Sequence, residues 1–317
     1  MEYYFAPMEG VTGSEFRRVH HKYFPGVDAY YMPFISPTQD HVFTQRELRN
    51  ILPENNQGFR AVPQLLTKNA EDFLWAAREL AAMGYDEINF NLGCPSATVT
   101  SKGKGAGLLS NPEFLHQLLG EIYEKAPVKI SIKTRLGMEQ PEEFERLLDV
   151  FQNYPVSLLI IHPRVRQDFY QHPIRMEYFE KAVQKYHGAI CFNGGLKTVE
   201  NCVTLEKQYP QIQSIMIGQG LLSNPALIQQ MKGLGELEKE RLMAFHDTLF
   251  QTYLEAFKSE RNMVFHMKEL WSYLMDLFEG AEKPWKKIRK AMDRAGYESG
   301  VQDMFALQLK IGKESHN

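Results

Sequence analysis

The chain has 317 residues, of which 44% are hydrophobic and 24% charged, and its formal net charge is −3. This composition is typical of a globular protein that is long enough for one large domain and a small second one. The net charge excludes a chain that binds nucleic acid as an overall polycation, and no apolar run approaches the ~20 residues that cross a bilayer.

Eight short apolar, β-branched or aromatic runs follow one another along the chain. Such runs are typical of parallel strands covered by helices. We predict strands at Tyr3–Ala6, Asp28–Met32, Ala61–Leu65, Glu87–Phe90, Val128–Ile132, Ser157–Ile161, Ala189–Phe192 and Ser214–Ile217. Amphipathic stretches with helix start signals lie between them. They predict helices at Ala70–Met83 after Asn69, Glu113–Lys125 after Asn111-Pro112, and Val199–Gln208 after Thr198, with Gly84 as a C-cap.

Eight strand–helix alternations predict an α/β fold of the (β/α)8 TIM-barrel type. A doubly wound open sheet is the alternative, but no glycine-rich dinucleotide fingerprint follows any strand. After Met231 the pattern changes: Lys232–Glu236 has the composition of a linker, and Leu237 to about Leu309 has helical spacing. We therefore predict a barrel domain, residues 1–232, and a small all-helical domain, residues 237–312.

One segment of the predicted helical domain is basic. Between Glu282 and Arg294, six basic residues stand against two acidic ones, a net charge of +4. The basic residues are Lys283, Lys286, Lys287, Arg289, Lys290 and Arg294. A solvated helix face and a surface that contacts phosphates both fit this pattern.

The N-terminus and the cysteines indicate the cellular compartment. Met1–Phe5 has neither a basic segment nor a cleavage site of small residues, so we expect no signal peptide. Cys94, Cys191 and Cys202 are odd in number and lack metal-binding spacing. We therefore expect a cytoplasmic protein without a disulfide framework or a metal site.

The active site of such a barrel lies at the C-terminal ends of the strands. Polar and glycine-rich residues end most of the predicted strands: Ala6-Pro7-Met8, Met32-Pro33, Gln64, Asn91–Pro95, Lys133-Thr134-Arg135, His162-Pro163-Arg164, Asn193-Gly194-Gly195 and Gly218-Gln219-Gly220. The glycines after the last two strands let backbone amides approach an anion, which predicts a phosphate site. Tight turns that need positive φ would explain one of these pairs.

Lys133 and His162 are expected to project from neighbouring strands near that phosphate site. A cation there could stabilise negative charge on a reduced isoalloxazine ring. Gln64 could hydrogen-bond the polar edge of a flavin, or it could be a buried amide that satisfies loop backbone.

Cys94 lies in the run Asn91-Leu92-Gly93-Cys94-Pro95. Gly93 and Pro95 predict a bent loop just beyond the fourth strand, which holds the thiol at the barrel mouth. A cysteine with a pKa of ~8.5 is mostly protonated at neutral pH, so Cys94 can act as a general acid. A nucleophilic role would need a nearby base or a depressed pKa. Cys191 and Cys202 are predicted to be buried packing residues.

Over nearly the whole chain, these residues resemble the tRNA-dihydrouridine synthase family. The resemblance runs through Ala6–Thr12, Glu87–Ser96, Lys133–Arg135, His162–Arg164, Asn193–Gly195 and Gly218–Gly220. It is most specific in the Cys94 segment and in Gly105–Leu109. The resemblance implies an FMN enzyme that uses NADPH to reduce uridine in tRNA to 5,6-dihydrouridine. Hydride would pass from flavin N5 to uracil C6 while Cys94 protonates C5, and the target base must be flipped out of the RNA.

Carried over position by position, the resemblance implies roles for individual residues. FMN would be lined by Pro7, Met8, Gln64, Lys133, His162, Asn193, Gly194, Gly195, Gly218 and Gln219. Asn91 and Cys94 would face the uracil, and the helical domain would help to hold the RNA. The expected RNA contacts are Lys102, Lys104, Arg135, Arg164, Arg166, Lys286, Lys287, Arg289 and Lys290. For Lys102 and Lys104, an exposed mobile loop is the alternative.

One position departs from the family pattern, which commonly has Gly-Arg where this chain has Gly218-Gln219. Losing a charge-assisted hydrogen bond costs ~1.5–3 kcal/mol, so we expect looser FMN retention than in an arginine-bearing relative.

Two other functions agree with part of the sequence. An FMN oxidoreductase of a free pyrimidine, of the dihydroorotate or dihydropyrimidine type, leaves the helical segment and its +4 charge unexplained. An RNA-binding protein without catalysis is compatible with Gln219 but not with the combination of Cys94, Lys133 and His162. No short motif encodes which uridine is reduced, whether the RNA is transfer or ribosomal, or the oligomeric state. We expect neither a membrane association nor an obligate protein partner.

Overall fold

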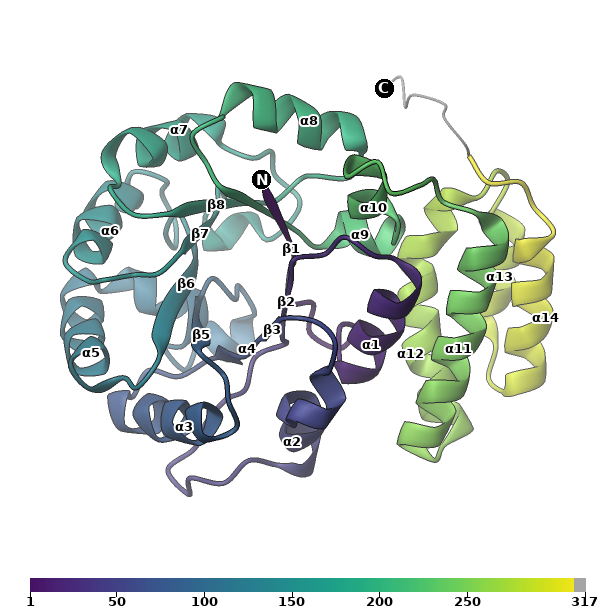
Figure 1. The fold of residues 1–317 in the computed structure, drawn as a ribbon, viewed down its shortest axis with the longest axis horizontal. Coiled ribbons are helices and arrows are strands. Elements are labelled where there is room, and N and C mark those ends of the chain that lie inside the picture. Colours follow the sequence, from purple (N-terminus) through teal and green to yellow (C-terminus); the bar gives the residue numbers. More distant parts are fainter. Residues whose placement is uncertain (311–317) are drawn as a thin grey trace. The chain divides into compact units, whose positions relative to one another are not determined.

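The computed structural model describes residues 1–310. Within them, nine strands form one parallel sheet in the order β3-β2-β1-β9-β8-β7-β6-β5-β4. Their bounds are β1 (Glu2–Phe5), β2 (Ala29–Tyr31), β3 (Ala61–Val62), β4 (Gln64–Leu65), β5 (Glu87–Leu92), β6 (Lys129–Arg135), β7 (Leu159–His162), β8 (Ile190–Asn193) and β9 (Ser214–Ile217). Helices surround the strands (Figure 1), so the predicted TIM barrel is confirmed.

The ninth strand arises because Pro63 divides the predicted third strand into β3 and β4. A proline has no N–H to donate to a ladder, but its carbonyl can still accept, and Pro63 O accepts from the N–H of Asn89 at 2.8 Å. β3 pairs with β2, while β4 pairs with β5. One continuous segment therefore joins the two edges of the sheet and closes the barrel.

Several strands run further than their apolar runs predicted. β5 ends at Leu92, β7 at His162 and β8 at Asn193, and β6 continues through Lys133 to Arg135. The predictions stopped at Phe90, Ile161, Phe192 and Ile132 because the side chains that follow become polar. The backbone ladder does not depend on side-chain polarity, so these polar residues extend from the strands themselves.

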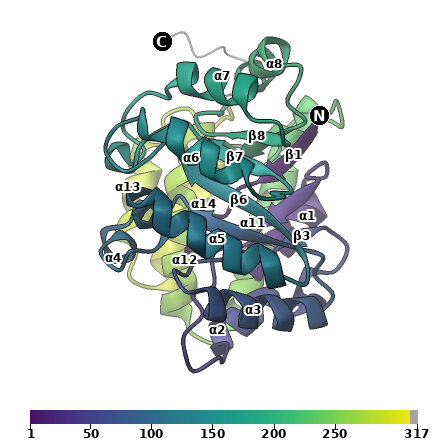
Figure 2. The ribbon, with the colours of Figure 1, turned by 90° about the vertical axis from the view of Figure 1, so that its left-hand side faces the viewer.

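The chain divides into two compact units. The first unit comprises Met1–Glu9, Asp28–Leu196 and Val203–Gly218, and it contains the whole sheet. Its helices are α2 (Gln45–Ile51), α3 (Ala70–Ala82), α4 (Ala97–Thr100), α5 (Pro112–Lys125), α6 (Glu143–Gln152) and α7 (Met176–Lys185), with 3-10 turns η1 (Pro53–Asn56), η2 (Gly105–Ser110) and η3 (Arg166–Asp168). Figure 2 shows α3, α5 and α6 on the outside of β5–β7.

Predicted start signals position two of these helices. The side-chain oxygen of Asn69 accepts from the N–H of Asp72 at 3.1 Å and caps α3. Asn111 caps α5 in the same way, accepting from the N–H of Phe114 at 3.0 Å. Gly84 follows α3 with φ +97, as its predicted place at the helix end requires.

Within the described residues, the second unit comprises Gly10–Val27, Lys197–Cys202 and residues 219–310. Its helices are α1 (Ser14–Tyr23), α9 (Gln219–Ser223), α10 (Leu227–Met231), α11 (Lys239–Phe257), α12 (Glu260–Leu274), α13 (Glu282–Lys290) and α14 (Arg294–Phe305), with the 3-10 turn η4 (Met275–Leu277). The helix α8 (Val199–Gln208) contributes residues to both units. The core of the second unit includes a hydrogen-bonded aromatic group, in which Tyr297 Oη accepts from Trp271 Nε1 at 2.9 Å.

The predicted helical character of the C-terminal segment is confirmed, and the predicted linker Lys232–Glu236 lies between α10 and α11. The domain bounds 1–232 and 237–312 stay a prediction, and residues 311 and 312 lie outside the described residues. No helix among residues 1–310 is long and apolar enough to span a membrane.

Candidate active site

Asn91, in β5, holds the loop that carries Cys94. Its Oδ1 accepts from the backbone N–H of Gly93 at 3.1 Å and from that of Cys94 at 2.9 Å. Its Nδ2 donates to Gln64 Oε1 at 2.7 Å, which leaves one amide hydrogen without a partner among the described residues. Asn91 therefore fixes the backbone at Cys94, and its predicted contact with a substrate base would use that remaining hydrogen.

Two further contacts make the Cys94 loop rigid. The Cys94 carbonyl accepts from the N–H of Ala106 at 3.1 Å, and the Gly93 carbonyl accepts from Arg135 Nε at 2.9 Å. Gly105 has φ +58, and a Cβ there would lie only 3.0 Å from the Cβ of Cys94. Only glycine fits this position, because it combines a left-handed backbone with close packing. Gly105 and Ala106 thus pack directly against Cys94.

The Cys94 thiol is half-buried. Burial raises its pKa above the usual range, although a backbone N–H at Ser96 and the charges of Arg135 and Lys133 oppose the shift. A raised pKa keeps the thiol protonated at neutral pH and argues against a nucleophilic thiolate. Cys191 and Cys202 are fully buried packing residues, as predicted.

Lys133 and His162 lie on the adjacent strands β6 and β7. Burial, and then the charge of Arg135, lower the pKa of the half-buried Lys133 to about 8. His162 is buried, and its pKa lies well below the usual value because of burial and then the charges of Arg135, Lys133 and Arg164. Arg164 Nη1 lies 3.0 Å from His162 Nε2, and a guanidinium can only donate. His162 is therefore neutral, with its proton on Nδ1.

At the ends of β8 and β9, the glycine backbone lies close to neighbouring side chains. Gly194 has φ +127, and a Cβ there would lie 2.6 Å from His162 Cδ2. Gly195 follows it, and a Cβ on Gly218 would lie 3.1 Å from Met8 Sδ. Asn193 Nδ2 donates to the Met216 carbonyl at 2.8 Å and ties the two strand ends together. Side chains would fill this space, so these strand ends form a cradle that exposes backbone.

Gln64 is fully buried inside the barrel. Its Nε2 donates to Asn89 Oδ1 at 2.7 Å, and Asn89 Nδ2 donates in turn to Ser131 Oγ at 2.9 Å. Together with the bond from Asn91, these contacts form a chain of amides across neighbouring strands. The partners of Gln64 are therefore side chains rather than the loop backbone that the sequence suggested. Pro7 and Met8, which follow β1, are half-buried.

Two of the arginines that are predicted to contact RNA form hydrogen bonds to loop backbone. Arg135 is only 1% exposed, and its Nη1 donates to the carbonyls of Val165 at 3.1 Å and Phe169 at 2.9 Å. Arg166 Nε donates to the Pro95 carbonyl at 3.1 Å. Both arginines therefore hold the loops after β5 and β7 around Cys94.

The sequence reasoning did not identify the aromatic pair Phe169 and Tyr170 in the loop after β7. These side chains are 41% and 53% exposed, and Phe169 has φ +48. Arginine guanidinium groups lie 5.2 Å from each ring, Arg166 over Phe169 and Arg135 over Tyr170. Tyr170 also lies 6.0 Å from the His162 ring. The sequence signal was two adjacent aromatic residues in a polar loop just beyond a strand.

The remaining predicted contacts divide between the two units. In the first unit Lys102 is exposed, and Lys104 Nζ donates to Ser36 Oγ at 3.0 Å. In the second unit Gln219 begins α9, and Lys287 of α13 forms an ion pair with Asp303 at 2.7 Å. Among the described residues, no ion pair engages three exposed cations of α13: Lys286, Arg289 and Lys290. Residues 1–310 contain no group of three or more His, Cys, Asp or Glu that could hold a metal ion.

Comparisons with known proteins agree with this arrangement. A family sequence model described as Dihydrouridine synthase (Dus) matches residues 4–307. The chain is similar to tRNA-dihydrouridine synthase B of Pasteurella multocida, with 26% identity over 94% of this chain and 84% of the relative. It is also 26% identical to the tRNA-dihydrouridine(16) synthase of Pseudomonas putida, over 93% of this chain and 94% of the relative.

Solved structures agree on the fold alone. Morphinone reductase superposes with a TM-score of 0.53 at 12% identity, over 75% of this chain and 87% of that protein. An old yellow enzyme homologue from Zymomonas mobilis superposes with a TM-score of 0.53 at 10% identity, over 75% of this chain and 90% of that protein. Because the family model covers nearly all of the sequence, this chain belongs to the dihydrouridine synthase family and is an enzyme of that family.

Proposed function

We propose that this enzyme reduces uridine in tRNA to 5,6-dihydrouridine, with FMN as its cofactor and NADPH as the reductant. The observation that carries the proposal is the Cys94 thiol, which is kept protonated and is held on a rigid loop at the strand ends. The relatives in Pasteurella multocida and Pseudomonas putida, which are named as tRNA-dihydrouridine synthases, support the choice of substrate.

The strand-end residues fit FMN. A phosphate needs backbone amides that can approach it closely, which Gly194, Gly195 and Gly218 allow. Lys133 supplies a cation that no ion pair engages among residues 1–310. Pro7, Met8, Gln64, His162, Asn193 and Gln219 would complete the lining. When bound, FMN would supply the two-electron chemistry that the reduction of uracil by NADPH needs.

Cys94 would supply the proton that the reduction also needs. Saturation of the C5–C6 bond requires a hydride at C6 and a proton at C5, and a protonated thiol can donate to C5 as a general acid. Lys133 would stabilise negative charge on the reduced isoalloxazine ring. His162 would donate from Nδ1, because Arg164 occupies its Nε2. Arg135 and Arg166 would position the loop without touching the base.

The RNA would have to present a base flipped out of its stack. Phe169 and Tyr170 offer exposed aromatic faces beside His162, where an unstacked base could lie. In the helical segment 237–312, we propose that Lys286, Arg289 and Lys290 contact phosphates. Lys102 and Arg164 would add contacts near Cys94. We propose that the enzyme acts in the cytoplasm.

A direct assay tests the proposal. Purified protein is given NADPH and either an unmodified tRNA transcript or free uracil, and the product is measured by mass spectrometry of the nucleosides. We expect flavin absorbance in the protein and a gain of two hydrogens on uridine in the tRNA only. Reduction of free uracil but not of tRNA would instead favour the small-molecule oxidoreductase. Binding of tRNA without any reduction would favour an RNA-binding protein.

A further inference from the structure

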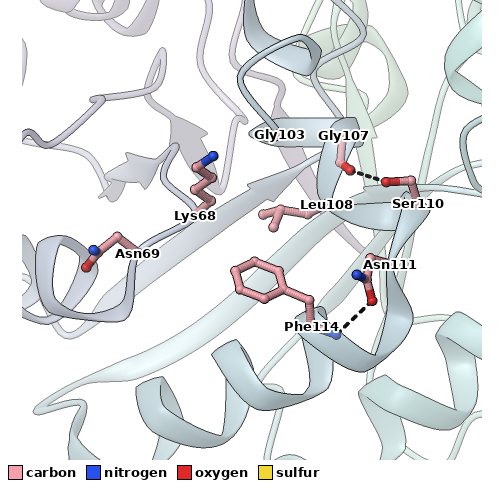
Figure 3. A pocket seen from close by; sticks show the side chains of 8 residues that line it. All are labelled: Lys68, Asn69, Gly103, Gly107, Leu108, Ser110, Asn111 and Phe114. Atoms are coloured by element: carbon pink, nitrogen blue, oxygen red, sulfur yellow. Dashed lines mark hydrogen bonds between the residues drawn. The ribbon is translucent and has the colours of Figure 1, made fainter.

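A pocket lies in the first unit, beside the loop that runs from Cys94 to α5. Its volume is about 460 Å³, which lies within the range of ~300–1,000 Å³ seen for small-molecule sites. It is lined by Lys68, Asn69, Gly103, Gly107, Leu108, Ser110, Asn111 and Phe114. These residues come from the starts of α3 and α5 and from the loop between Cys94 and α5 (Figure 3).

The pocket has an aromatic wall and an apolar floor. Phe114 is 40% exposed although it is a large apolar side chain at the start of α5. Figure 3 shows its ring below Leu108, with Lys68 above and to the left of Leu108. An exposed ring of this kind can stack on a planar aromatic ligand, and such stacking is typical of sites for unpaired nucleobases.

Lys68 lines the other wall, and Lys102 and Lys104 lie on either side of Gly103, which also lines the pocket. A Cβ on Gly103 would lie 3.7 Å from Lys68 Nζ, so that ammonium lies over the turn that joins Lys102 to Lys104. The pKa of Lys104 is lowered first by burial, and the charges of Lys102 and Lys68 lower it further. Like charges held together repel, and a bound anion relieves that repulsion. Neither Lys68 nor Lys102 forms an ion pair with any of the residues that the structure describes.

No acidic side chain is among the residues that line the pocket, although the charge of Asp72 raises the pKa of Lys104 more than Lys102 or Lys68 lowers it. Asp72, which also acts on Lys104, lies 3.4 Å from His41 Nε2, and Glu113 pairs with Arg146. Glu71 is exposed in the first turn of α3. The pocket lining thus combines the exposed ring of Phe114 with one charged side chain, the ammonium of Lys68, which complements a ligand made of a planar base and a phosphate.

We propose that this pocket binds one nucleotide of the RNA substrate other than the uridine that is reduced, with its base on Phe114 and its phosphate at Lys68. The inference rests on the proposed function, because the RNA is the ligand. It also links RNA binding to Cys94. Gly107 and Leu108 line the pocket, while Gly105 and Ala106 of the same 3-10 turn pack against Cys94. A nucleotide in the pocket would therefore hold the Cys94 loop in place.

Binding of an unmodified tRNA transcript to the FMN-loaded protein tests this inference. Fluorescence anisotropy over a series of salt concentrations gives the Kd for the wild type, Phe114→Ala, Phe114→Tyr and Lys68→Ala. Lys125→Ala is the matched control, because Lys125 is an exposed lysine at the opposite end of α5. Flavin absorbance and circular dichroism verify that each variant is folded and loaded.

We expect Phe114→Ala to weaken binding about tenfold, which corresponds to ~1.4 kcal/mol, while Phe114→Tyr restores it because the ring is retained. Lys68→Ala should lower the slope of log Kd against log salt by ~0.7, the value for one phosphate of a single strand. Lys125→Ala should change neither quantity.

Three outcomes of these measurements would overturn the inference. If the wild type binds and reduces tRNA while Phe114→Ala and Lys68→Ala behave like Lys125→Ala, the pocket does not hold RNA, although the proposed function stands. If the two variants instead raise only the KM for NADPH, the pocket belongs to the dinucleotide. If the wild type does not bind tRNA, both the inference and the proposed function fail.

Discussion

Lys133→Met is expected to stabilise the cofactor-free protein. Burial and Arg135 lower the pKa of Lys133 from 10.5 to about 8. This difference means that holding Lys133 charged in the folded, cofactor-free protein costs up to ~3 kcal/mol. Methionine has a similar length and no charge, so it removes this cost. The free energy of unfolding at pH 7 should therefore rise by as much as ~3 kcal/mol.

The gain in the free energy of unfolding from Lys133→Met should depend on pH. Below pH 8 the lysine is charged in both the folded and the unfolded chain, so the whole penalty is present. Between about 8 and 10.5 the folded protein has released this proton while the unfolded chain keeps it, and the penalty shrinks. The gain from Lys133→Met should therefore fall to ~1 kcal/mol near pH ~9.5.

Urea unfolding of the cofactor-free protein at the two pH values measures the gain. Lys129→Met is the control, because Lys129 is an exposed lysine at the start of the same strand. It should show no pH-dependent gain. The reasoning is refuted if Lys133→Met is less stable than the wild type at neutral pH, or if its gain is equal at both pH values. The same variant should bind FMN at least ~10-fold more weakly, since a charge-assisted contact contributes ~1.5–3 kcal/mol.

Three further predictions concern the strand ends. Gln219→Arg should tighten FMN binding ~10-fold or more by adding a charge-assisted hydrogen bond, and an unchanged Kd for FMN in a titration would contradict this. Gly194→Ala should lower the free energy of unfolding by ~2–4 kcal/mol and weaken FMN binding. The reason is that the new Cβ would lie 2.6 Å from His162 Cδ2 at a residue whose φ is +127. Denaturant unfolding measures the effect, and a fully stable variant would contradict the prediction. Because burial raises the pKa of Cys94, uridine reduction should persist above the usual thiol pKa of ~8.5 and fall only at higher pH; a rate that rises with pH throughout would indicate a thiolate instead.

Local sequence patterns predicted most of the fold. The apolar runs predicted every strand, because a strand buried on both faces needs a nearly continuous apolar segment. They placed the ends of β5 to β8 too early, since Lys133, Arg135 and His162 keep strand geometry while their side chains turn polar. The division at Pro63 could have been predicted from its missing N–H.

The site was only partly accessible to sequence reasoning. Strand-end positions identified Cys94, Lys133 and His162 because a parallel barrel brings those ends together. The role of Arg135 could not be predicted, because its bond to the Gly93 carbonyl joins residues far apart in the sequence. Nor does any pattern reveal that Phe169 adopts a left-handed backbone, because tertiary contacts impose it.

The Phe114 pocket was also not predictable. Its walls come from α3, from α5 and from the loop between Cys94 and α5, and no spacing in the sequence relates Lys68 to Phe114. Only the tertiary structure brings these two side chains to one cavity.

The central claim is that Cys94 gives the proton in the reduction of uridine in tRNA. The most direct measurement compares Cys94→Ala with the wild type in two half-reactions, the reduction of bound flavin by NADPH and the formation of dihydrouridine in an unmodified tRNA transcript. We expect the variant to bind FMN and oxidise NADPH at the wild-type rate, while dihydrouridine formation falls by ~10²–10⁴-fold, the usual contribution of a general acid. Full dihydrouridine formation by Cys94→Ala would contradict the assignment.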